Sequence, residues 1–248
     1  MKMLDGKNAI ITGARRGIGR ATVEVFASNG ANIWACARKP DEKFEEDMRK
    51  LAGKYGVDIW PVYFDTTSEE QIKTAIVMIR KSKKAVDILI NIAGLVEDST
   101  SFTMTSMEKI RKVFEVNFFG LTLLTQYVSR LMIRQNRGTI INISSIAAID
   151  GTPAQYEYAS SKAAVIGGVR QLAREMAPYN IRVNAVAPGI VDTEMSEHIE
   201  ENLKESILRD IMMKRVARPE EIGNVCMFLA SDLSSYMTGQ IIRVDGGI

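Results

Sequence analysis

The sequence predicts a single α/β domain, in which a doubly wound parallel sheet of seven strands is flanked by helices. Short β-rich runs recur along the chain and are apolar at nearly every position, which is typical of strands buried on both faces. Longer segments of helical period separate these runs, and strict alternation of strands and helices favours a parallel sheet. No Pro/Ser-rich linker divides the chain, so we expect one domain over residues 1–248.

Each element follows from the local pattern. The expected strands are the apolar runs 8–12, 32–37, 58–64, 86–91, 139–144, 182–187 and 240–244. The expected helices are the periodic segments 17–29, 41–55, 68–84, 106–135, 155–177 and 219–231. Pro219 begins the last helix, where a missing N–H costs nothing. A polar, helix-prone insertion within residues 190–214 interrupts the alternation.

Composition excludes several classes of protein. The chain has 32 Lys and Arg against 30 Asp and Glu, a net charge of +2, so no basic footprint predicts a nucleic-acid partner or an anionic membrane surface. Two cysteines and one histidine, His198, argue against a disulfide scaffold, a metal site and a His-based triad. No apolar run approaches the ~18 residues of a membrane helix. The first residues do not resemble a signal peptide, so we expect a cytoplasmic protein.

The first strand–helix junction is rich in glycine and reads TGARRGIG over residues 12–19. Gly13 allows a sharp turn, Gly17 allows backbone to approach a pyrophosphate, and Gly19 allows close helix–strand packing. A tight turn without a ligand would also use glycine. The position in the first strand–helix unit, with a helix N-terminus behind it, favours a dinucleotide site.

The spacing of these glycines resembles that of the short-chain dehydrogenase/reductase family, and further motifs match along the whole chain. They are Asp65, the NIAG run at 91–94, Asn117, Ser145, the YASSK run at 158–162 and the PGIVDT run at 188–193. Within the family, the chain is most similar to β-ketoacyl-acyl-carrier-protein reductases. The resemblance implies a Rossmann-type fold and an oxidoreductase that transfers hydride between a nicotinamide cofactor and a carbonyl. Ile92 departs from the second Asn that the family often has.

The end of the second strand favours NADP(H) over NAD. This strand ends at Ala37 and Arg38, without the carboxylate that usually bonds the adenosine ribose. Arg15, Arg16 and Arg38 could gather at a 2′-phosphate, because guanidinium groups suit phosphate oxygens. Solvated surface arginines are the alternative.

The resemblance implies a set of cofactor-binding residues. Asp65 would bond the adenine amino group and Thr193 the carboxamide. The full set is Gly13, Arg15, Arg16, Gly17, Ile18, Gly19, Arg38, Asp65, Thr66, Asn91, Ala93, Gly94, Tyr158, Lys162, Pro188, Gly189, Ile190 and Thr193.

Tyr158 and Lys162 are four residues apart and therefore share one face of a helix. The pKa of a free tyrosine is ~10, and a nearby ammonium lowers it toward neutrality. The resemblance implies that Tyr158 donates a proton, Ser145 polarises the substrate carbonyl, and Asn117 holds a water that links Lys162 to solvent. A Tyr-x-x-x-Lys pair alone would more often be an amphipathic face with a snorkelling lysine.

The predicted function is NADPH-dependent reduction of a carbonyl, with a 3-oxoacyl thioester on an acyl carrier protein as one substrate. Residues 190–214, which include Met195, His198, Met212 and Met213, would form a substrate lid. An acidic carrier needs basic residues at the mouth of the site, and Arg130, Arg134 and Arg137 are candidates. Tyr179 stands where a carrier-dependent enzyme would have arginine.

Two alternatives remain open on sequence alone. One is an NADP-dependent dehydrogenase of a sugar, a polyol or another small ketone. The other is an NADP(H)-binding sensor or scaffold without turnover, against which the intact Ser145, Tyr158, Lys162 and Asn117 argue. In the family the helices expected at 106–135 and 155–177 pack across a dimer interface, so a homotetramer or a homodimer is expected.

Overall fold

The computed structural model describes residues 2–194 and 208–248. Its centre is a seven-stranded parallel sheet, as the sequence predicts, and the strand order is β3-β2-β1-β4-β5-β6-β7. The strands are β1 (Asn8–Thr12), β2 (Asn32–Ala37), β3 (Ile59–Tyr63), β4 (Ile88–Asn91), β5 (Gly138–Ile143), β6 (Ile181–Pro188) and β7 (Ile241–Val244). Every pair of neighbouring strands is parallel, so all the carboxyl ends lie along one edge of the sheet.

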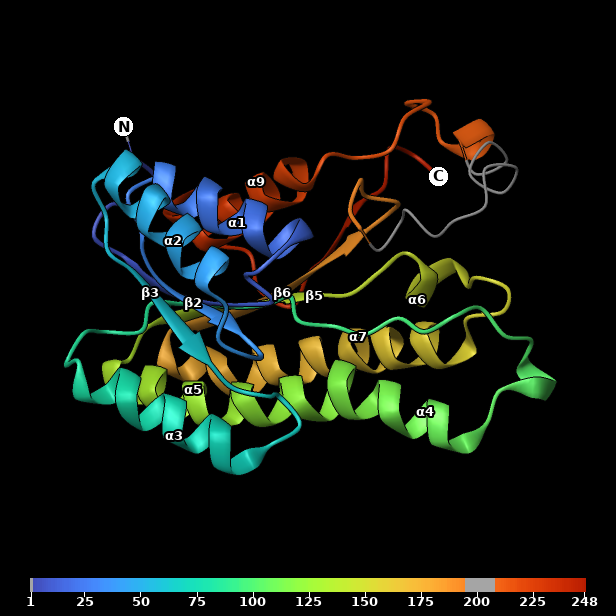
Figure 1. The fold of residues 1–248 in the computed structure, drawn as a ribbon, viewed down its shortest axis with the longest axis horizontal. Coiled ribbons are helices and arrows are strands. Elements are labelled where there is room, and N and C mark those ends of the chain that lie inside the picture. Colours follow the sequence, from blue (N-terminus) through green and yellow to red (C-terminus); the bar gives the residue numbers. More distant parts are fainter. Residues whose placement is uncertain (1, 195–207) are drawn as a thin grey trace.

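Helices cover both faces of the sheet (Figure 1). On one face lie α1 (Gly17–Ser28), α2 (Glu42–Tyr55) and α9 (Pro219–Ala230). On the other face lie α3 (Glu69–Lys81), α4 (Met107–Phe114), α5 (Leu121–Gln135) and α7 (Tyr156–Met176). Each layer has its own hydrophobic core, centred on Phe26 and Met48 on the first face and on Leu124 and Val169 on the second.

The helix expected over residues 106–135 is not continuous. The chain forms α4, then a π-helical turn η2 (Glu115–Gly120), then α5. The wider turn coincides with a close approach of backbone: a Cβ on Gly120 would lie 2.5 Å from the carbonyl oxygen of Thr66. Periodicity does not reveal such a turn, because both flanking helices keep their apolar faces. Asn117 lies within this turn and is fully buried.

The order in which strands are added to the sheet reverses at β1. The strands β2 and β3 lie on one side of β1, and β4 and the later strands lie on the other. In open parallel sheets a crevice forms at the carboxyl ends of the strands at such a point. Short connections follow these ends, including α6 (Ala147–Asp150) after β5. Of the insertion at 190–214, residues 195–207 lie outside the described residues, and Met195 and His198 with them. No helix in the described ranges is long and apolar enough to cross a membrane.

Candidate active site

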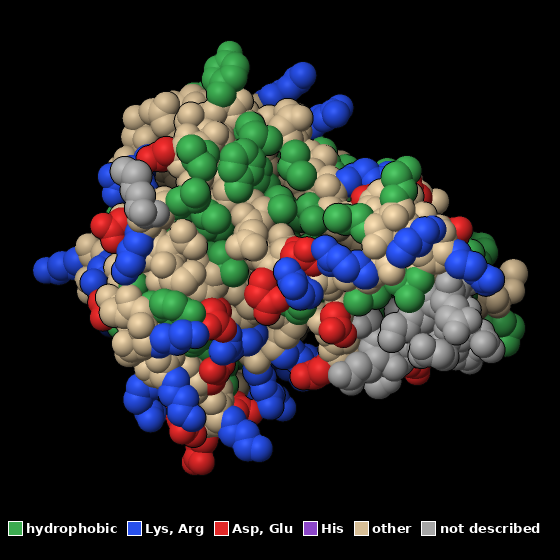
Figure 2. All heavy atoms as spheres, turned by 90° about the horizontal axis from the view of Figure 1, so that it is seen from above, with side chains coloured by type: hydrophobic (Ala, Val, Ile, Leu, Met, Phe, Trp, Pro, Cys, Tyr) green, Lys and Arg blue, Asp and Glu red, His purple; other side chains and the backbone are tan. Residues whose placement is uncertain are grey.

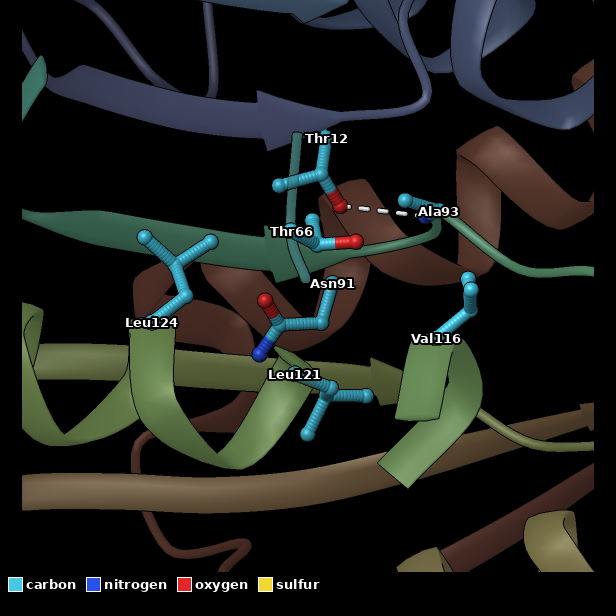
Figure 3. A pocket seen from close by; sticks show the side chains of 7 residues that line it. All are labelled: Thr12, Thr66, Asn91, Ala93, Val116, Leu121 and Leu124. Carbon is cyan, nitrogen blue, oxygen red and sulfur yellow. Dashed lines mark hydrogen bonds between the residues drawn. The ribbon is translucent and has the colours of Figure 1, made fainter. Parts of the chain in front are cut away.

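The loops after β1 and β4 are tied together by Thr12. Its Oγ1 accepts hydrogen bonds from the backbone N–H of Ile92 at 2.9 Å and of Ala93 at 3.0 Å. Figure 3 shows this link above a narrow pocket between the strand ends and the π-helical turn. The pocket is lined by Thr12, Thr66, Asn91, Ala93, Val116, Leu121 and Leu124. Four of the predicted site residues therefore lie at or beside one crevice: Thr66, Asn91, Ala93 and, in the adjoining turn, Asn117.

Asn91 presents an unused acceptor at this pocket. Its Nδ2 donates to Thr125 Oγ1 at 3.0 Å and to Asn142 Oδ1 at 2.8 Å. Its Oδ1 is buried and has no hydrogen-bond partner among the described residues. Because such an atom is costly to leave unpaired, the crevice suits a ligand or water that brings a donor.

The three glycines of the glycine-rich loop stand where a side chain would be strained or would clash. Gly13 and Gly17 have positive φ values of 67° and 52°. A Cβ on Gly13 would lie 3.1 Å from Ala93 N, and one on Gly19 would lie 2.0 Å from the Gly13 carbonyl oxygen. Ile18 is half-buried and packs against the core below the loop. The first turn of α1 holds no acidic residue, so its free N–H groups suit the phosphates of a dinucleotide.

The three arginines expected at one phosphate have different surroundings. Arg15 pairs with Asp41 at 2.6 Å, beyond the end of β2. Arg16 pairs with Glu194, beyond the end of β6. Arg38 is exposed and makes no ion pair with a described residue. The structure thus places Arg15 and Arg38 on the β2 side of the loop, whereas Arg16 turns toward the segment after β6.

Asp65 organises the turn after β3. Its Oδ1 accepts hydrogen bonds from the N–H of Thr67 at 2.9 Å and from the Thr67 hydroxyl at 2.8 Å. Asp65 is half-buried, and Thr66 beside it lines the pocket. The turn therefore places Asp65 after the end of β3, directly before the pocket-lining Thr66.

Ser145 and Tyr158 meet on the other side of the crevice. Ser145 follows β5 and is buried, and its Oγ accepts from the backbone N–H of Ala147 at 3.2 Å. Burial raises the pKa of the Tyr158 phenol, and a hydrogen bond from the Ser145 side chain opposes the rise. Two hydroxyl groups are thus adjacent, which allows both to address one oxygen of a substrate.

Lys162 lies one turn along α7 from Tyr158 and is 3% exposed. Its Nζ donates to the carbonyl oxygen of Ile143 at 2.8 Å and lies 6.0 Å from the centre of the Tyr158 ring. Burial lowers the pKa of this ammonium from 10.5 to about 8. Lys162 can therefore exchange a proton close to neutral pH.

Asn117 and Lys162 both border Gly94. A Cβ on Gly94 would lie 3.3 Å from Lys162 Nζ and 3.4 Å from Asn117 Oδ1. The Asn117 side chain exchanges two hydrogen bonds with the backbone of Leu95 and donates to Ser161 Oγ at 3.0 Å. The Asn117 side-chain oxygen thus accepts from a backbone N–H, and the water expected at this residue stays a prediction.

The segment after β6 runs beside the glycine-rich loop. Pro188 ends β6, and a Cβ on Gly189 would lie 2.9 Å from the Cα of Asp245. Ile190 is held by its carbonyl oxygen, which accepts from Ala217 N at 2.9 Å. A Cβ on Gly17 would lie 3.2 Å from the Cγ2 of Thr193. Of the predicted residues of this segment, Thr193 therefore lies against the loop that is expected to hold the phosphates.

Two serines support the site and were not singled out by the sequence. Ser144 Oγ donates to the carbonyl oxygen of Lys162 at 2.9 Å, and Ser161 Oγ donates to that of Tyr158 at 2.8 Å. Both are buried. The only signal was their place beside Ser145 and inside the YASSK run.

The basic residues considered for carrier binding do not border the site within one chain. Arg130 and Arg134 lie in the second half of α5, which starts near Asn117 and runs ~20 Å away from it. Arg137 donates to Asp87 at 3.1 Å, before the start of β4. All three therefore lie toward the amino ends of the strands, whereas Ser145 lies at the carboxyl end of β5.

Known proteins resemble this chain over its whole length. A family model described as "Enoyl-(Acyl carrier protein) reductase" matches residues 13–248. The 3-oxoacyl-[acyl-carrier-protein] reductase of Thermotoga maritima is 41% identical over 247 residues, which cover 99% of this chain and 98% of the relative. A 3alpha-hydroxysteroid dehydrogenase of Mediterraneibacter gnavus is 39% identical over 252 residues, with 98% and 97% covered. The crystal structure of a 3-oxoacyl-[acyl-carrier protein] reductase from Brucella melitensis superposes with a TM-score of 0.92 at 29% identity, covering 100% of this chain and 92% of that one.

A seven-stranded parallel sheet with a glycine-rich loop at its switch point, and a Ser–Tyr–Lys group beside it, defines an oxidoreductase that uses a nicotinamide cofactor. The chain belongs to the short-chain dehydrogenase/reductase family.

Proposed function

We propose that this oxidoreductase uses NADPH to reduce the 3-keto group of an acyl thioester carried by an acyl carrier protein. The observation that carries the reaction type is the adjacency of the Ser145 and Tyr158 hydroxyls with the buried Lys162 behind them. The substrate class is supported by relatives of up to 41% identity that are named 3-oxoacyl-[acyl-carrier-protein] reductases.

The proposed roles follow from the state of each group. Bound NADPH would supply the hydride for the carbonyl carbon. Burial keeps Tyr158 protonated, so its Oη can donate a proton to the carbonyl oxygen as negative charge develops there. Ser145 Oγ would hydrogen-bond the same oxygen. Lys162 Nζ, with a pKa of about 8, would return a proton to the Tyr158 oxygen. Asn117 would keep Leu95 and α7 in place around these groups.

The preference for NADPH is supported by the chain at the end of β2. Ala37 leaves no carboxylate that would repel a 2′-phosphate, and Arg15 and Arg38 lie on that side of the glycine-rich loop. The cofactor-binding residues expected from the sequence are all part of the proposal. Arg16 pairs with Glu194, so it would have to leave this partner to bind a phosphate. The proposal keeps residues 1–248 as one domain and 190–214 as its substrate lid.

An assay of NADPH consumption tests the proposal. We expect turnover with acetoacetyl-CoA and faster turnover with an acetoacetyl group on an acyl carrier protein. Crotonyl-CoA tests reduction of an enoyl group. A 3-ketosteroid tests the activity for which the Mediterraneibacter gnavus relative is named. A panel of sugars and small ketones tests the alternative of a sugar, polyol or small-ketone dehydrogenase. Turnover with crotonyl-CoA alone, or with a steroid or sugar alone, would overturn the substrate class. Binding of NADPH without turnover of any substrate would favour a sensor.

Tyr158→Phe tests the role of Tyr158 in the same assay. Because only the phenolic oxygen is removed, we expect loss of turnover by at least about a thousandfold, with the Kd for NADPH changed less than about twofold. Substantial residual turnover would remove Tyr158 from its role as the proton donor.

We further propose a homotetramer located in the cytoplasm. Large apolar side chains remain exposed after β6, at Phe228 of α9 and at Leu233 and Tyr236 beyond it. Figure 2 looks onto the face that carries α1 and α9 and shows hydrophobic side chains gathered on part of it. On the opposite face, Gly167 and Gly168 of α7 have open space above them, where another helix could approach closely. Apolar patches of this kind mark interaction surfaces.

A further inference from the structure

A buried ion pair lies immediately beside Tyr158 and has no part in the proposed chemistry. Glu157, the residue before Tyr158 in α7, is 1% exposed, and its Oε1 lies 3.1 Å from Nζ of Lys109 in α4. The second oxygen, Glu157 Oε2, is buried and has no hydrogen-bond partner among the described residues. The Lys109 ammonium is therefore what balances this carboxylate, and a buried charge without such a partner is strongly destabilising.

Lys109 also holds the loop that follows β4. Its Nζ donates to the carbonyl oxygen of Asp98 and, at 3.0 Å, to Thr100 Oγ1. With Glu157 these make three partners, as many as a lysine ammonium has protons to donate. The ion pair and the loop therefore share one cation.

The same loop docks on the start of α7 at two further points. The N–H of Thr100 donates to the carbonyl oxygen of Ala154 at 2.9 Å. The rings of Phe102 and Tyr156 meet edge to face with centroids 4.7 Å apart. The loop 96–105 is thus fixed against residues 154–157, which lead directly into Tyr158. Its outer side chains Phe102 and Met104 are 63% and 75% exposed, so the loop presents apolar groups to solvent next to the site.

We propose that Lys109 and Glu157 are positioning residues for the reaction: their buried pair fixes the loop 96–105 on the first turn of α7, and this loop forms the substrate-facing wall beside Tyr158. Neither residue touches the cofactor or the reacting atoms. Their effect belongs to substrate binding, and so to KM more than to kcat. The kinetic part of this inference rests on the proposed function, whereas the placement of the loop can be tested without any substrate.

Lys109→Met tests the proposal, and Lys112→Met is its matched control. Lys112 lies one turn further along α4 and also pairs with the loop, through Glu97, but its side chain is 60% exposed against 15% for Lys109. In Lys109→Met we expect KM for acetoacetyl-CoA to rise at least about tenfold, with kcat changed less than about threefold and the Kd for NADPH unchanged. In Lys112→Met we expect changes below about twofold, because exposed pairs contribute little.

Hydrogen exchange gives a readout that needs no turnover. The amide of Thr100 should exchange at least about tenfold faster in Lys109→Met than in the wild type or in Lys112→Met, because its bond to Ala154 opens when the loop is released. If wild-type protein turns over none of the substrates, the proposed function fails while this measurement still decides the placement of the loop.

Lys109→Met leaves Glu157 buried without its cation and can impair folding. The double variant Lys109→Met/Glu157→Leu removes both charges and keeps apolar volume, so we expect it to recover much of the lost stability in urea. KM and Thr100 exchange should stay raised in the double variant, because Asp98 and Thr100 still lack their donor. Recovery of KM together with stability, or equal KM in Lys109→Met and Lys112→Met, would overturn the proposal.

Discussion

Lys162 is a cation that the fold holds at a cost. It is 3% exposed, and its pKa falls from 10.5 to about 8 because burial disfavours the charged form. One pKa unit corresponds to ~1.4 kcal/mol, so the penalty at neutral pH is of the order of 3 kcal/mol. A group held in this way is common at functional sites, where the chemistry needs a pKa near the working pH.

Lys162→Met should therefore stabilise the protein at pH 7, by roughly 1–3 kcal/mol, while it abolishes turnover. Between the folded pKa of about 8 and the unfolded value of 10.5, the unfolded chain binds more protons, so wild-type stability rises with pH. The advantage of the variant should shrink across this window. Urea unfolding at pH 7 and pH 10 measures both effects. A variant that is no more stable at pH 7 would contradict the cost of burial.

The end of β2 should decide between the two nicotinamide cofactors. Ala37→Asp combined with Arg38→Ala places a carboxylate where the 2′-phosphate is expected and removes an exposed guanidinium. We expect the ratio of kcat/KM for NADPH to that for NADH to fall at least about tenfold, because the carboxylate repels the phosphate and can bond a ribose hydroxyl. The single variant Lys39→Ala, next in the chain, is the control. An unchanged ratio would sink the assignment.

At the scale of elements, α1 and the glycine-rich loop form one unit. A Cβ on Gly19 would lie 2.0 Å from the carbonyl oxygen of Gly13, so α1 must move away from the loop to admit it. Gly53 in α2 is also helical, but a Cβ there meets nothing within 4 Å. Close packing therefore requires a glycine at position 19 but not at position 53, although both lie in helices of the same layer.

Gly19→Ala should weaken NADPH binding by about tenfold or more and lower the urea midpoint, because the N–H groups of α1 lose their alignment with the loop. Gly53→Ala should leave the Kd unchanged and raise stability by ~0.5–1 kcal/mol, since alanine loses less backbone entropy. Fluorescence titration with NADPH and urea unfolding measure these outcomes. Equal effects of the two substitutions would show that the contact at Gly19 is not limiting.

The edge strand β3 carries a proline at the position where it does least harm. The N–H of Ile33 donates to the carbonyl oxygen of Asp58, and the N–H of Phe64 donates to that of Ala37. The backbone groups of the even-numbered residues in this stretch therefore point toward β2. Pro61 is odd-numbered and turns its backbone to the open edge, where its missing N–H interrupts no bond of the sheet. The same position discourages another strand from pairing with this edge.

At the scale of the whole molecule, the two hydrophobic cores are complete within one chain, yet large apolar side chains remain outside them. Leu233 and Tyr236 are 66% and 103% exposed. The double variant Leu233→Glu/Tyr236→Glu should reduce the proposed tetramer to a smaller species in light scattering, because charge at an apolar interface is costly.

Met78→Glu is the control for this change, since Met78 is 48% exposed on α3. It should leave the assembly intact. A wild-type protein that is monomeric at every concentration would contradict the proposed assembly.

The sequence by itself predicted the seven-stranded parallel sheet, and its motifs named the candidate site residues. Strands buried on both faces leave an unambiguous apolar signal, and the expected run at 8–12 coincides with β1. Most glycine and catalytic motifs stand at strand ends, so strand prediction already places Ser145 and the loop at 12–19 at one edge. The resemblance then supplied the roles of Tyr158 and Lys162.

Only the tertiary structure decided what depends on contacts between distant segments. The π-helical turn that contains the buried Asn117 coincides with close packing at Gly120, which local periodicity does not encode. Arg16 pairs with Glu194, far along the chain, whereas Arg15 pairs with Asp41. Glu157 reads as an ordinary helix carboxylate until Lys109 is seen beside it. Sequence patterns report burial and local conformation, whereas the pairing of charges is settled by which segments the fold brings together.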